Sequence, residues 1–110
     1  MTLDDLAAYG ANVTEGVARC VGMEAFYLKL VESVKTDPSF EALRTAIADN
    51  RLDDAFEASH ALKGVLANLS ITPILEPVEE ICELLRARTE MDYSELMGKI
   101  NSEYERFLAL

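Results

Sequence analysis

The chain has 110 residues, half of them hydrophobic, which excludes a disordered tail and provides enough apolar surface for one modest core. Its formal net charge of −10, from 20 acidic and 10 basic residues, opposes nucleic acid and anionic membrane surfaces as partners. There is no transmembrane-length apolar stretch, no signal-peptide pattern at the N-terminus and no paired cysteine motif, so the expected location is cytoplasmic.

Two short helices are predicted at the N-terminus. The first runs from Leu3 to Tyr9 and ends at Gly10. The second starts at a capping-box pattern, residues 12–15, and ends at Gly22.

A longer arm is predicted from Met23 to Asp49. An interruption at Asp37-Pro38 divides it, with Asp37 as N-cap and Pro38 as first residue of the continuing helix. Its apolar residues fall at helical spacing and are expected to face the core: Met23, Phe26, Tyr27, Leu30, Val31, Val34, Phe40, Leu43 and Ile47.

Three more arms follow after corners marked by turn residues. They are predicted at Arg51–Ser70, Thr72–Arg88 and Asp92–Leu110, the second with Thr72 as N-cap and the third opened by a capping box, residues 92–95. The last arm carries an apolar stripe of Tyr93, Leu96, Met97, Ile100, Tyr104, Phe107 and Leu108. Short connections favour antiparallel neighbours. The sequence therefore predicts one all-α domain over 1–110, with short helices in 1–22 and an antiparallel four-helix bundle in 23–110.

The helix predicted at 51–70 carries the candidate chemistry. At about 100° per residue, one arc holds the residues expected in the core: Ala55, Ala58, Leu62, Val65, Leu66 and Leu69. The opposite side holds His60, Lys63, Gly64 and Ala67, one above another, and shares Asp53, Phe56 and Glu57. The only histidine of the chain is therefore predicted to face outward.

The neighbours of His60 favour more than an ordinary exposed histidine. Gly64 in mid-helix costs about 0.8–1.0 kcal/mol relative to Ala, and it points outward, where an absent side chain clears space for another molecule. Lys63, one turn from His60, has an ammonium suited to pairing with a phosphoryl group. Ala67 extends the clearing, and Phe56 either packs under a neighbouring helix or forms part of a docking patch.

The segment His60-Ala-Leu-Lys63-Gly64 and the small residues after it resemble the signature of histidine-phosphotransfer (HPt) domains. The resemblance covers roughly residues 23–88. It implies that His60 is the phosphoacceptor, that Lys63 offsets phosphoryl charge and that Gly64 and Ala67 admit the partner. It further implies partners that are response-regulator receiver domains, or a hybrid sensor kinase, with Mg²⁺ on the receiver and no autonomous kinase activity in this chain.

The resemblance departs from the family at one position. Many members carry a Glu or Gln 22 residues after the histidine, where it orients the ring, and here that position is Cys82. Either another group holds the ring, or the ring is held loosely. The candidates for such a group are Glu79, one helical turn from Cys82, and Glu57. For Cys82 itself, a small core residue is the favoured interpretation over a redox role.

Two alternatives remain open. The chain could be a non-phosphorylated HPt-like bundle that binds a receiver or kinase, or a metal-dependent or hydrolytic enzyme. One histidine excludes paired-histidine zinc sites, so no metal ligands are predicted, and Ser59 points about 100° away from His60. A monomer is the default expectation, and Met1 with the close-fitting length favours a stand-alone protein.

Overall fold

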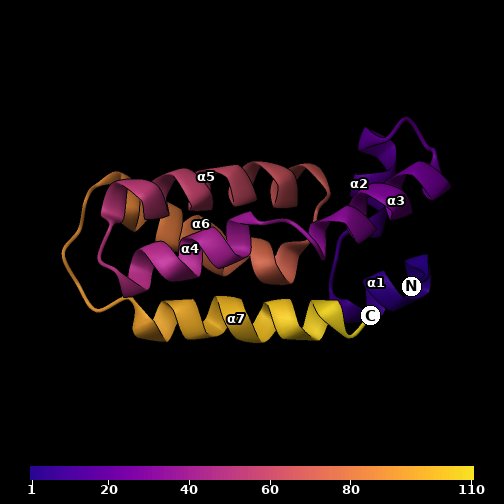
Figure 1. Cartoon of the computed structure of the whole chain (residues 1–110). Coiled ribbons are helices and arrows are strands. Elements are labelled where there is room, and N and C mark those ends of the chain that lie inside the picture. Colours follow the sequence, from indigo (N-terminus) through magenta and orange to yellow (C-terminus); the bar gives the residue numbers. More distant parts are fainter.

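The computed structural model describes all of residues 1–110, and every regular element in it is a helix (Figure 1). The all-α prediction is thus confirmed, and no helix is long and apolar enough to span a bilayer. In chain order the helices are α1 (Leu3–Tyr9), α2 (Val13–Arg19), α3 (Glu24–Val34), α4 (Ser39–Ala48), α5 (Leu52–Asn68), α6 (Thr72–Arg86) and α7 (Ser94–Leu108).

The bundle is formed by α4, α5, α6 and α7, which lie side by side and run alternately in opposite directions (Figure 1). α3 continues the arm of α4 beyond the end of the bundle, toward α1 and α2. The long loop between α6 and α7 closes the opposite end. The expected four arms are therefore present, with the first divided into α3 and α4.

The predicted helix starts differ from the structure where aspartate was expected to cap. Asn12 does accept the backbone N–H of Glu15, which is one half of the predicted capping box, but its own backbone N–H donates to the carbonyl of Ser70, so the other half is absent. Asp37 and Asp92 instead accept the N–H two residues on, from Ser39 and Ser94, in short Asx turns. The helices consequently begin at Ser39 and Ser94, and the predicted capping box at 92–95 is wrong; Thr72 likewise is the first residue of α6, not its cap.

One continuous core fills the bundle and confirms most of the predicted apolar positions. Four predicted core residues are exposed: Met23 by 60%, Phe26 by 46%, Leu108 by 42% and Val65 by 36%. Phe26 lies on α3 and Met23 directly precedes this helix, which projects past the bundle, so no other helix covers that side. Ser59 is fully buried and its hydroxyl donates to the carbonyl of Phe56.

The N-terminal helices close one end of the bundle through hydrogen bonds to the end of α5. The guanidinium of Arg19 donates to the carbonyl of Ala67 (2.9 Å), and the backbone N–H of Asn12 donates to the carbonyl of Ser70 (2.9 Å). The buried Tyr27 hydroxyl donates to the carbonyl of Leu69 at 2.8 Å. These donors satisfy carbonyls that the end of a helix leaves without partners.

The turn between α2 and α3 holds a residue in an unfavourable conformation. Val21 has φ +57°, in the left-handed region, and its side chain is 87% exposed. A β-branched residue is strongly disfavoured there. Neither burial nor backbone geometry within this chain accounts for a valine at this position.

Candidate functional site

His60 lies exposed near the middle of α5, on the face opposite the buried residues Ala55, Leu62 and Leu66. One turn further on, Gly64 is also exposed, and a Cβ added to it would meet no atom within 4 Å. Close packing inside the molecule therefore does not require this glycine. The geometry leaves an imidazole with open space on the side from which another molecule can approach.

The aromatic ring of Phe56 supports the imidazole. The two rings stack with centroids 5.6 Å apart and planes inclined by 25°. Arg86 and Arg88, from the end of α6 and the turn after it, lie 5.1 and 5.2 Å from the centroid of the Phe56 ring. Phe56 is half-buried beneath them, so of its two predicted roles it takes the first, packing against a neighbouring helix.

Lys63 lies one turn from His60, as predicted, but its ammonium is already paired. Lys63 Nζ donates to Glu83 Oε1 of α6 at 3.3 Å, and Glu83 also lies 3.4 Å from Arg86. The pKa of Glu83 lies below its ordinary value, first because Lys63 donates this hydrogen bond and further because Arg86 is close. Glu83 therefore holds Lys63 toward α6 until a stronger anion competes for it.

The remaining candidate residues are spread around this centre. Cys82 is a free thiol with no exposed surface, which confirms a small core residue at this position. Glu57 and Glu79 are exposed, and no hydrogen bond joins Glu57, Glu79 or Cys82 to His60. Ala67 is half-buried and Arg19 donates to its carbonyl, so the approach is less open there than at Gly64.

Sequence reasoning missed the residues that α6 and the turn after it contribute. Arg86, Arg88 and Glu83 surround Phe56 and Lys63, and Arg88 Nε pairs with Asp53 Oδ1 at 2.6 Å. The signal was the Arg-Ala-Arg run that ends the third predicted arm. An antiparallel neighbour brings that end beside the start of α5, so a cationic cluster was predictable once the pairing was assumed.

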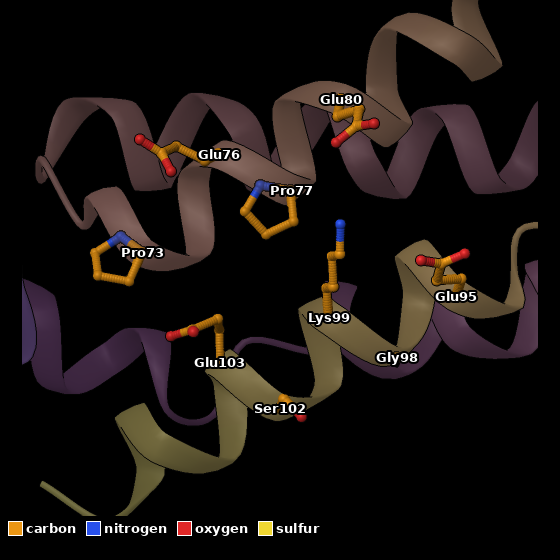
Figure 2. Close-up of a pocket in the computed structure, with 9 residues that line it drawn as sticks. All are labelled: Pro73, Glu76, Pro77, Glu80, Glu95, Gly98, Lys99, Ser102 and Glu103. Carbon is orange, nitrogen blue, oxygen red and sulfur yellow. The ribbon is translucent and has the colours of Figure 1, made fainter.

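The largest hollow lies elsewhere, between α6 and α7, and contains none of the candidate residues (Figure 2). It has a volume of about 570 Å³, and Lys99 extends from α7 toward α6 among four glutamates. Pro77 and Gly98 also line it. The described residues include no group of three or more His, Cys, Asp or Glu side chains arranged to hold a metal ion.

Comparison with known families agrees with this geometry. A scan against protein-family models matches residues 29–110 to the Hpt domain, which includes α5 and all the residues around His60. Comparisons with curated proteins and with solved structures gave no match. Hpt domains are phosphocarrier modules that take part in histidine phosphotransfer in phosphorelays, where they interact with receiver domains and kinases. Because the match covers well over half of the chain, this protein belongs to the Hpt domain family.

Proposed function

We propose that this protein carries a phosphoryl group on His60 between the aspartates of response-regulator receiver domains, acting as a monomer in the cytoplasm. The observation that carries the proposal is the pairing of an exposed imidazole with the open space at Gly64. A glycine in a helix interior is unfavourable by about 0.8–1.0 kcal/mol relative to alanine. Access of a partner to His60 accounts for a glycine at this position despite that loss of stability.

In the proposed transfer, a neutral imidazole nitrogen of His60, Nε2, attacks the phosphorus of the receiver's aspartyl phosphate in line. The N–P bond forms as the P–O bond to the aspartate breaks, the aspartate leaves as a carboxylate, and the imidazole keeps its proton on Nδ1. Mg²⁺ and most of the stabilisation of transition-state charge are expected to come from the receiver. This chain supplies the nucleophile and its setting, without kinase activity of its own.

Two neighbours have defined parts in this proposal. The Phe56 ring, stacked on the imidazole, takes over the orienting role that a Glu or Gln plays in many Hpt domains and that Cys82 cannot fill from the core. Lys63 exchanges Glu83 for the phosphoryl oxygens, because a phosphoryl group carries more charge than one carboxylate. Its side chain is 34% exposed and so retains freedom to turn.

The experiment is a labelling assay with a matched variant. Receiver domains phosphorylated by acetyl phosphate are mixed with the wild-type chain and with His60→Gln, and acid-labile, alkali-stable phosphate is measured on each. Label on the wild-type chain alone is the expected result. A correctly folded wild-type chain that binds a receiver without gaining label would favour the alternative, an interaction bundle that carries no phosphate.

A further inference from the structure

The turn after α6 holds an arginine in a backbone conformation that arginine disfavours. Arg88 has φ +53°, in the left-handed region, and it directly follows Ala87, the last capping residue of the helix. Glycine is the usual residue at such a position, because a Cβ atom makes the left-handed conformation unfavourable. The turn itself therefore does not call for an arginine, and the reason for one lies in the contacts of its side chain.

Three contacts fix the guanidinium of Arg88. Its Nε lies 2.6 Å from Oδ1 of Asp53, near the start of α5, and its Nη1 donates to the carbonyl of Leu85 at 2.6 Å. Its central carbon, Cζ, lies 5.2 Å from the centroid of the Phe56 ring, within the range of a cation–π contact. The side chain thus reaches from the end of α6 to α5 and lies over Phe56.

Phe56 passes this restraint on to His60. The two rings stack with centroids 5.6 Å apart, and Phe56 lies one turn before His60 on the same helix. Because the Phe56 ring is only half-buried, core packing alone does not fix its orientation. A guanidinium held over the ring favours one orientation, and in that orientation Phe56 also stacks on the imidazole.

A second arginine contacts the same ring but is less suited to hold it during transfer. Arg86 lies 5.1 Å from the centroid of the ring, and its carboxylate partner is Glu83, at 3.4 Å. In the proposed transfer, Lys63 leaves this same Glu83, so the surroundings of Arg86 change. Arg88 pairs with Asp53 instead, a carboxylate that has no other cationic partner in the chain, so its contact with the ring is kept when the phosphoryl group arrives.

We infer that Arg88, anchored by Asp53, is a positioning residue for phosphate transfer and holds the Phe56 ring against the imidazole of His60. No hydrogen bond within the chain joins Glu57, Glu79 or Cys82 to that imidazole, so its orientation depends on the stacked ring. The inference rests on the proposed function and deepens it, since it names the group outside α5 that orients the phosphoacceptor.

NMR of the whole chain tests the positioning directly, because His60 supplies the only imidazole signals. An aromatic ring shifts the signals of protons that lie over its face. Phe56→Leu should therefore move the imidazole proton signals toward the values of a free histidine, and Arg88→Gln should move them part of the way in the same direction. Arg88→Lys keeps the charge without the planar guanidinium and should recover only some of the wild-type shift.

Kinetic assays show whether this position matters for transfer. For Arg88→Gln, kcat/KM for transfer from a receiver phosphorylated by acetyl phosphate should fall about tenfold, as a small displacement of the reacting nitrogen implies. Asp53→Asn should act in the same direction but less, because Arg88 keeps its bond to Leu85. The Arg88–Asp53 pair is largely exposed and contributes little to stability, so both variants should fold, which circular dichroism checks.

The chain offers a matched control at its other end. Arg106 lies 5.1 Å from the centroid of the Tyr9 ring and pairs with Glu103 at 2.8 Å, which repeats the arrangement of Arg88 without a histidine. Arg106→Gln should leave both the imidazole signals and kcat/KM unchanged.

Phe56→Leu separates positioning from direct contact with the phosphoryl group. If Arg88 acts through the ring, Arg88→Gln should slow transfer no further in a chain that already carries Phe56→Leu. An equal further loss in that background would mean that Arg88 contacts the phosphoryl group or the receiver, and would overturn the positioning role. A wild-type chain that takes label but whose imidazole signals do not respond to Arg88→Gln would overturn that role alone, whereas a wild-type chain that takes no label would refute the proposed function and this role together.

Discussion

Gly64→Ala is expected to stabilise this protein while slowing its phosphate transfer. Gly64 lies within α5, where alanine is favoured over glycine by about 0.8–1.0 kcal/mol, and the added methyl group meets no atom within 4 Å. Neither a clash nor a positive φ reduces that gain, since Gly64 has helical backbone geometry. For a domain of this size the midpoint of thermal unfolding should rise by about 4–8 °C.

The same methyl group stands on the path to His60. A displacement of about 1 Å at a reacting centre can lower a rate about a hundredfold, so we expect kcat/KM for transfer from a phosphorylated receiver to fall at least about tenfold. Gly98→Ala is the matched control, because Gly98 is also exposed within a helix, α7, and an added Cβ there meets nothing within 4 Å. It should raise the unfolding midpoint equally and leave transfer unchanged.

Two results would contradict this reasoning. A lower unfolding midpoint for Gly64→Ala would mean that the site is not open in the folded chain. A higher midpoint with unchanged transfer would mean that the glycine does not serve the partner.

Three further predictions follow from other parts of the molecule. Val21→Asn should raise the midpoint of thermal unfolding by relieving the positive φ at an 87% exposed side chain, a gain of about 1 kcal/mol; an unchanged midpoint would refute it. Lys63→Gln should slow phosphate transfer about tenfold, and Glu83→Gln should speed it severalfold because it releases Lys63. If both variants change the transfer rate in the same direction, Lys63 does not exchange Glu83 for the phosphoryl oxygens. Burial raises the pKa of all four tyrosines above the ordinary value of 10.0, which keeps the proton on the folded chain after the unfolded chain has lost it. Stability should thus be full below about pH 10 and decline above it, and equal urea midpoints at about pH 9 and about pH 11 would exclude this. These tyrosines are Tyr9, Tyr27, Tyr93 and Tyr104.

The sequence predicted the features that depend on one helix at a time. Gly10 and the residues at helical spacing located the helices, and the wheel of α5 placed His60 and Gly64 on its outer face, because these properties follow from local geometry. It failed where two segments meet. Val65 and Phe26 match the apolar period of their helices, yet the end of the bundle leaves both exposed.

At the candidate site too, contacts between two helices could not be predicted from either helix alone. The Lys63–Glu83 pair and the arginines over Phe56 depend on the register between α5 and α6, which neither helix specifies alone. The Asx turns at Asp37 and Asp92 were missed for another reason, since the same residue types can cap a helix or form a turn just before it.

The closed end of the bundle determines how short a fragment of this protein can be and still fold. A chain cut at residue 29, where the family match begins, would lose Leu6 and Tyr27, both fully buried, together with Arg19 and its bond to the end of α5. Each large buried side chain contributes about 1.5–3 kcal/mol, against a total of about 5–15 kcal/mol for a typical domain. A fragment limited to the matched residues is therefore expected to be markedly less stable than the whole chain, and fragments for biophysical work should keep α1 and α2.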